Sequence, residues 1–302
     1  MSTTDEQRHG TKDRRKFYPP RAFIVKDGWS LYHHAPMKNL WLIATFMLVA
    51  NICANAQWLN YPESKTPRME DGKPNPAAPA PRRDGKPDIS GVWHPAPSTK
   101  AEWESVLGPH GLDLQTDLDF ASKYAINLLA DFKPGEEPLR RAPGPPPKTE
   151  NQCLPDSLPF ANYITPFKIV QAPEQLVFLY ESKSPARQVF LDGRPLPKDP
   201  QPSWMGYSVG KWSGDVLTVE SIGFRGDASL DGMGHPRSES ARITERYRRR
   251  DFGHMDLETT VNDPVNYTRP FTVKVTLLLI PDSDVQEYVC AENERDRTHL
   301  DR

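Results

Sequence analysis

Apolar and polar residues alternate along the chain from Phe167 onward, in short segments separated by turns rich in glycine, proline and aspartate. Alternation with a period of two is typical of strands that rest one face on a core. No segment of helical length lies between these strands, so we expect an antiparallel meander without parallel crossovers. The pattern predicts about nine strands, at 167–170, 176–180, 187–191, 207–212, 216–222, 242–248, 254–261, 271–280 and 285–290.

The odd positions from Ala241 to Tyr247 are mostly apolar, and the odd positions of the next two strands continue this face. We therefore expect one face on a core and the other in solvent. Sequential strands of this kind often close into a barrel, which removes exposed edges. A first strand near 88–94 contains Gly91-x-Trp93, which resembles the opening of lipocalin-like barrels. We predict a mainly β protein whose meander closes into a calycin/lipocalin-like barrel over 151–302. An open curved sheet or a sandwich is the alternative.

The segment 57–150 has a different composition. The chain has 32 prolines against 18 glycines, and many of the prolines crowd this segment. Proline fixes φ and removes a backbone donor, which disfavours regular sheet. We expect a Pro-rich arm of extended chain laid over the folded body, with one or two short helices. One would run from a Ser98 cap to Leu107, and the other would span 119–131.

An apolar run at 40–50 follows Met37-Lys38 and precedes Ala54-Asn55-Ala56. This layout is typical of a secretory signal peptide at 37–56, and the run is too short to span a membrane. We expect Met37 as the functional start, cleavage after Ala56, and 1–36 as a non-native or disordered leader. The alternative is an uncleaved membrane anchor. The sequence thus predicts a periplasmic or secreted protein with no stable membrane insertion after processing.

Cleavage after Ala56 would leave two of the three cysteines, Cys153 and Cys290. An even cysteine count in an exported protein favours a disulfide between them. Two unrelated buried thiols are the alternative. The chain carries 38 basic and 40 acidic side chains, which argues against a broadly basic nucleic-acid binder.

Longer motifs extend over most of 58–300. They include DGKPDISGVW, WMGYSVGKWSGD and TERYRRRDFGH. Together they resemble a family of exported bacterial proteins with no established activity. The resemblance implies export and an all-β body, but it implies no reaction. The chain departs from the family pattern near 139–148, where a Pro-rich stretch replaces a more helical one.

Glu245 is the strongest candidate for chemistry, because its parity places a carboxylate on the inward face. An inward carboxylate must be paired or protonated, and such groups are enriched at functional sites. A structural ion pair with an inward arginine is the alternative. His235, in a Gly-rich loop, is the second candidate, as a general base. The spacing of these residues and His254 matches no zinc motif, and we predict no metal and no cofactor.

Aromatic residues near the predicted turns could line a ligand site or plug the core. The predicted ligand-binding residues are Trp204, Tyr207, Trp212, Glu220, Tyr247 and Tyr267. The basic run at 246–250 alternates with Tyr247 and has acidic neighbours, which favours a solvated strand face over a polyanion site.

Three functions remain open, and all leave the oligomeric state undetermined. The first is an exported barrel that binds a small apolar or aromatic ligand. The second is an acid–base hydrolase or lyase using Glu245 and His235 at the barrel mouth. The third is an envelope interaction protein whose Pro-rich arm engages a partner.

Overall fold

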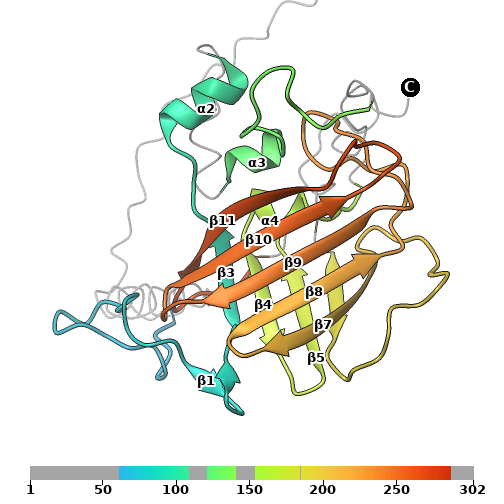
Figure 1. Ribbon diagram of the computed structural model, residues 1–302. Helices are drawn as coiled ribbons and strands as arrows, with labels where there is room; N and C mark the ends of the chain where they lie inside the picture. Colours follow the sequence, from blue (N-terminus) through green and yellow to red (C-terminus); the bar gives the residue numbers. More distant parts are fainter. Residues whose placement is uncertain (1–60, 109–120, 141–153, 184, 287–302) are drawn as a thin grey trace, which may run out of the picture. The chain divides into compact units, whose positions relative to one another are not determined.

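A computed structural model describes residues 61–108, 121–140, 154–183 and 185–286 (Figure 1). All of them belong to one compact unit, Trp58–Arg302. The predicted leader at 1–36 and signal peptide at 37–56 lie outside the described residues, as do Cys153 and Cys290. Within the described ranges, no helix has the length and apolar character needed to cross a membrane.

Nine strands form a closed barrel in the order β10-β11-β3-β4-β5-β6-β7-β8-β9. The mainly β, calycin-like barrel predicted from the alternation is therefore confirmed. The Gly91-x-Trp93 strand, β3, pairs with β4 on one side and with β11 on the other. It therefore closes the barrel between the first and the last of the later strands. The strands are β3 (Gly91–Pro95), β4 (Phe167–Gln171), β5 (Gln175–Tyr180), β6 (Ala186–Phe190), β7 (Tyr207–Ser213), β8 (Val216–Ile222), β9 (Arg242–Arg249), β10 (His254–Asn262) and β11 (Phe271–Ile280).

The prediction of a purely antiparallel meander is wrong at one place, because β6 and β7 pair in parallel. Their connection, 191–206, is extended and contains four prolines, at 195, 197, 200 and 202. A connection of this length can return along the barrel without a helix, since an extended chain covers about 3.3 Å per residue. The predicted last strand is not seen either: Val285 and Gln286 lie in no strand, and 287–290 lie outside the described residues.

The helices are short. Those of the described residues are α2 (Lys100–Leu107), α3 (Lys123–Ile126) and α4 (Ala161–Ile164). The cap of α2 is Thr99, which forms a capping box with Glu102, and not Ser98 as predicted. The Ser98 hydroxyl instead accepts a bond from Lys123 N at 2.7 Å. The helix predicted over 119–131 is described from 121 onward, and there only α3 forms.

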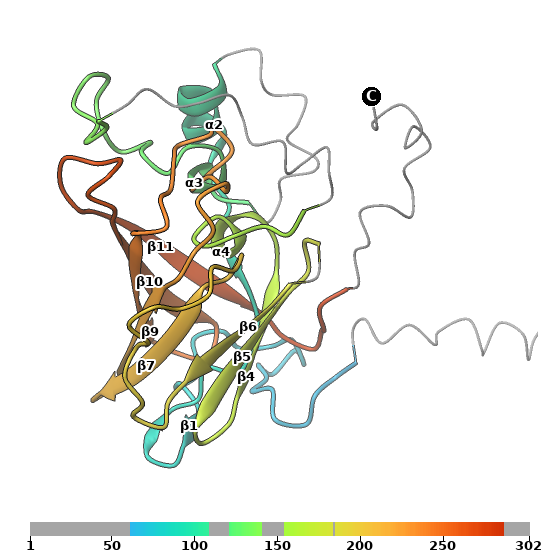
Figure 2. The ribbon, with the colours of Figure 1, turned by 90° about the vertical axis from the view of Figure 1, so that its right-hand side faces the viewer.

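The two ends of the barrel are covered differently. The three helices gather over one end, and the arm that carries β1 (Arg82–Arg83) and β2 (Lys86–Pro87) lies at the other (Figures 1 and 2). At the arm end, the guanidinium of Arg249 lies 4.9 Å from the ring centroid of the fully buried Trp93. Buried aromatic rings pack inside the barrel, with Phe167, Phe178 and Tyr180 in mutual contact.

Candidate functional site

Glu245 lies inside the barrel with no exposed surface, in agreement with its strand parity. Its carboxylate pairs with Arg187, whose Nη1 lies 3.2 Å from Oε1 and whose Nη2 contacts Oε2. Tyr247 Oη and Asn162 Nδ2 also donate to Oε1, at 2.9 and 2.6 Å. The structure therefore shows the ion pair with an inward arginine that the sequence left as an alternative.

Arg187 is equally well satisfied. Its Nε donates to Ser208 Oγ at 3.1 Å and its Nη2 donates to Ser221 Oγ at 2.9 Å. Burial alone would lower the pKa of Arg187, but the Glu245 carboxylate outweighs it and holds that pKa above its ordinary value. Burial, reinforced by Glu245, also raises the pKa of Tyr247, so this phenol stays protonated as a donor. These side chains form a closed polar cluster.

Sequence reasoning missed Arg187, although a signal for it was present. Arg187 shares its parity with the buried Val189 on the same strand, so the alternation already placed it inward. Asn162 gave no comparable signal. It lies on the four-residue helix α4, which covers one end of the barrel and was not predicted.

His235 lies in the loop between β8 and β9 and is buried. Its Nδ1 is 2.5 Å from Asp231 Oδ2, and the same oxygen accepts the Leu128 N–H at 2.6 Å. Asp231 Oδ1 accepts the N–H groups of Met233 and His235. Among the described residues, no hydrogen bond links His235 to Glu245. The contact with Asp231 thus holds His235 within its own loop. The structure does not bring together Glu245 and His235, the two predicted catalytic residues.

The six predicted ligand-binding residues do not form one site. Tyr247 belongs to the closed polar cluster, and Tyr267 is buried, donating to Pro236 O at 2.9 Å. Glu220 is half-exposed and pairs with Arg242 at 2.5 Å on the outer surface. Trp212 is partly buried and packs against the core. Trp204 and Tyr207 do come together.

Trp204 and Tyr207 line a groove of about 450 Å³ at the junction of β6 and β7, here called the seam groove. The two strands pair only at Val189–Ser208 and Phe190–Val209. On the N-terminal side of these two pairs, the two backbone segments diverge. The groove lies between them. Its other apolar walls are Phe190 and Met205, its polar rim includes Gln188 and Ser203, and Arg187 and Ser208 close it from the barrel interior.

Gly206 shapes this groove. Its φ is +66°, and a Cβ at this position would lie 2.6 Å from the Phe224 ring and 2.7 Å from Ile222 O. Only glycine combines this left-handed backbone with so close an approach. The turn that presents Trp204 and Tyr207 to the groove therefore depends on a residue without a side chain.

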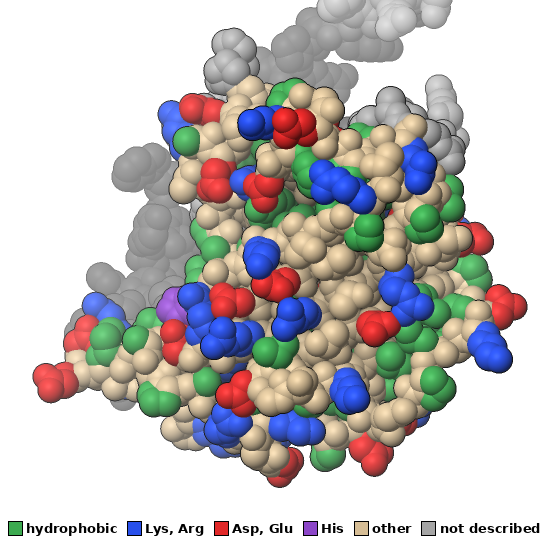
Figure 3. All heavy atoms as spheres, viewed as in Figure 1, with side chains coloured by type: hydrophobic (Ala, Val, Ile, Leu, Met, Phe, Trp, Pro, Cys, Tyr) green, Lys and Arg blue, Asp and Glu red, His purple; other side chains and the backbone are tan. Residues whose placement is uncertain are grey.

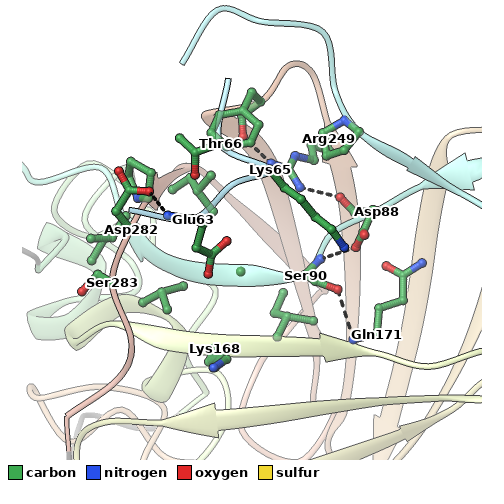
Figure 4. Close-up of a pocket in the computed structure, with 18 of the residues that line it drawn as sticks. Glu63, Lys65, Thr66, Asp88, Ser90, Lys168, Gln171, Arg249, Asp282 and Ser283 are labelled. Atoms are coloured by element: carbon green, nitrogen blue, oxygen red, sulfur yellow. Dashed lines mark hydrogen bonds between the residues drawn. The ribbon is translucent and has the colours of Figure 1, made fainter. Parts of the chain in front are cut away.

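A second pocket, of about 390 Å³, lies between the arm and the outer face of β3 and β4. Figure 4 shows the side chains of Glu63 and Lys65 reaching into it. Its other charged groups are largely engaged. Arg83 pairs with Asp88 at 3.0 Å, and Lys168 pairs with Asp284 at 2.8 Å.

Arg249 also lines this second pocket and donates to three carbonyl oxygens, those of Asp88, Asp251 and Phe252. Burial lowers the pKa of Arg249 to about 10, which still leaves it charged at neutral pH. These bonds tie the arm to the turn between β9 and β10. The polar groups of the second pocket thus act chiefly in joining the arm to the barrel.

The basic run at 246–250 alternates between surface and interior, because Arg246, Arg248 and Arg250 are exposed whereas Arg249 is buried. Arg246 is 3.6 Å from Glu258, and Arg250 is 3.2 Å from Asp256. In Figure 3, basic and acidic side chains intermingle on the visible face. The pairing of Arg246 and Arg250 fits the solvated strand face expected from the alternation, but the buried Arg249 departs from that expectation.

No family model, curated protein or solved structure matches the chain. The resemblance to exported bacterial proteins therefore stays a prediction. In the part of the chain that the structure describes, no three His, Cys, Asp or Glu side chains gather as a metal-binding group.

Proposed function

We propose that the protein binds a small ligand with an apolar or aromatic body in the seam groove. The observation that carries this proposal is the gap left where β6 and β7 separate, walled by Phe190, Trp204, Met205 and Tyr207. Its volume of about 450 Å³ lies within the range of about 300–1,000 Å³ typical of small-molecule sites, which are mostly apolar with a few polar groups. The ligand would thus bind at the barrel wall and not in its lumen.

The acid–base alternative has less support. All the partners of Glu245 come from the closed polar cluster, so proton transfer by this carboxylate would disrupt a buried ion pair. Such a disruption is costly, because a buried charge without a partner is strongly unfavourable. His235 lies elsewhere and is held by Asp231.

The interaction-protein alternative relies on the Pro-rich arm, where Tyr61 and Met69 are 65% and 44% exposed, and on exposed apolar side chains of the barrel wall. Val170 and Leu179 are 42% and 37% exposed on the adjacent strands β4 and β5. Isolated exposed residues of this kind are normal on soluble surfaces. The groove is therefore the better-supported site, and export to the periplasm or the medium is proposed with it, on the predicted signal peptide alone.

The test is a titration of the purified protein with N-phenyl-1-naphthylamine, a neutral aromatic probe whose fluorescence rises in apolar sites. We expect saturable binding that Trp204→Leu weakens by about tenfold or more, as for other buried aromatic anchors. Trp212→Leu is the matched control, because it makes the same change outside the groove and should leave binding within about twofold. Circular dichroism confirms that both variants fold. Equal affinities for both variants, or no saturable binding, would exclude the seam groove as the site.

A further inference from the structure

We propose that the ligand is an aromatic acid, whose planar body lies in the seam groove and whose carboxylate contacts Arg225 at the rim. This inference rests on the proposed function and adds the chemical class of the ligand. It follows from how two arginines stack on the aromatic walls of the groove.

Arg225 does not itself line the groove, but it is held against Trp204, which does. Its guanidinium carbon lies 4.7 Å from the centroid of Trp204. Nε and Nη2 donate to the two carboxylate oxygens of Asp227 at 2.9 and 2.5 Å. Among the described residues, none accepts a bond from Nη1. The guanidinium is thus fixed in orientation beside a groove wall, and both N–H groups of Nη1 remain available as donors.

Arg194 stacks on another wall residue in a similar way. Its guanidinium carbon lies 3.9 Å from the centroid of Phe190, which itself packs 5.4 Å from Tyr207. Nε and Nη2 bond Asp192, and Nη1 donates to Tyr207 Oη at 3.4 Å. Arg194 therefore has no terminal nitrogen without a partner, and this difference singles out Arg225 as the anion donor.

The charges around the groove agree with this assignment. Arg187 is the one charged residue among those that line the groove, and its donors are used inside the barrel. Asp192 and Asp227, which pair with Arg194 and Arg225, do not line the groove, and no other acidic side chain of the described residues lines it. A cationic ligand would meet two guanidinium groups that already occupy the aromatic rings favoured by cations. An anion would gain a charge-assisted hydrogen bond at the rim.

The experiment compares 2-naphthoate, 2-naphthamide and 2-naphthylmethylammonium, which share one aromatic body and differ in the charge of one substituent. Displacement of N-phenyl-1-naphthylamine from the full chain measures each affinity. We expect naphthoate to bind about fivefold more tightly than the amide, the scale of a partly exposed charge pair, and the ammonium to bind most weakly. This preference should shrink at high salt, because ions screen exposed charges.

Arg225→Gln should remove the preference for naphthoate while the affinity for naphthamide stays within about twofold. Arg242→Gln, which removes an equivalent surface charge that is paired with Glu220 on the outer surface, should keep the preference. Equal binding of the three probes would overturn the acid assignment and leave the groove intact as a site. Loss of preference in Arg194→Gln but not in Arg225→Gln would overturn the choice of arginine. If no probe binds, the proposed function itself fails.

Discussion

The strands β6 and β7 present two contrasting environments on either side of the barrel wall. On the inner side, Arg187 and Ser208 belong to a polar cluster in which every charge has a partner. On the outer side, Phe190 and Tyr207 face a groove with apolar walls and open space. A buried charge has to be fully satisfied for the fold to be stable. The closed polar cluster is therefore suited to stability, whereas the seam groove keeps surface available for a ligand.

Removing one charge from the closed polar cluster is expected to have the largest effect. Glu245→Gln keeps the shape but leaves Arg187 without its counter-charge. We expect the free energy of unfolding to fall by about 3–5 kcal/mol, measured by chemical denaturation. Glu220→Gln is the control, because its half-exposed pair with Arg242 should contribute at most about 1 kcal/mol. Equal midpoints for the two variants would show that the inner cluster does not stabilise the fold.

The disulfide predicted between Cys153 and Cys290 lies outside the described residues and stays a prediction. Asp156 bonds Ser182 Oγ and Lys183 Nζ at 2.5 and 2.9 Å, and Gln286 N bonds Glu181 Oε2 at 3.2 Å. In the sequence, Cys153 lies three positions before Asp156, and Cys290 lies four positions after Gln286.

We expect reduction of this bridge to cost about 2–4 kcal/mol of stability. Intact-mass analysis after thiol labelling, with and without reductant, tests the bond in protein exported to an oxidising compartment. Two labelled thiols without reductant would rule it out. Binding of N-phenyl-1-naphthylamine before and after reduction then shows whether the bridge also supports the groove.

Gly206→Ala should damage the groove more than the barrel. A Cβ at this position meets the Phe224 ring and Ile222 O on a left-handed backbone, with an expected cost of about 1–3 kcal/mol. Gly193→Ala is the control, since Gly193 also has a positive φ but nothing within 4 Å of its Cβ position. The probe should bind Gly206→Ala more weakly than Gly193→Ala, and the reverse order would argue against this turn as a wall of the groove.

The smallest expected effect is a change in ligand affinity on removing the charge next to Arg225. Asp227→Asn removes a negative charge beside Arg225 but keeps an oxygen that can accept its Nε–H. The affinity for 2-naphthoate should then rise by about twofold to threefold, while that for 2-naphthamide should not change. Isothermal titration calorimetry can measure both. A decrease for naphthoate would mean that Asp227 acts mainly by orienting Arg225.

Strand alternation alone predicted much of the barrel. It placed eight of its strands in sequence and turned Glu245 inward, because the side-chain period of a strand is a local property of the backbone. The same parity also places Arg187 on the inward face, although Arg187 is not among the predicted site residues. The short helix α4 could not be predicted in this way, since a single turn of helix carries too little periodicity to be recognised.

The sequence by itself determined which residues face the core, where the turns fall and that the arm is rich in proline. Only the tertiary structure decided that β6 and β7 pair in parallel, that Arg187 meets Glu245 across 58 positions, and that Trp204 and Tyr207 share a groove. The physical reason is that alternation reports only the local environment of each strand. Pairing partners and wall gaps depend on how the whole sheet closes, which brings together residues far apart in the chain.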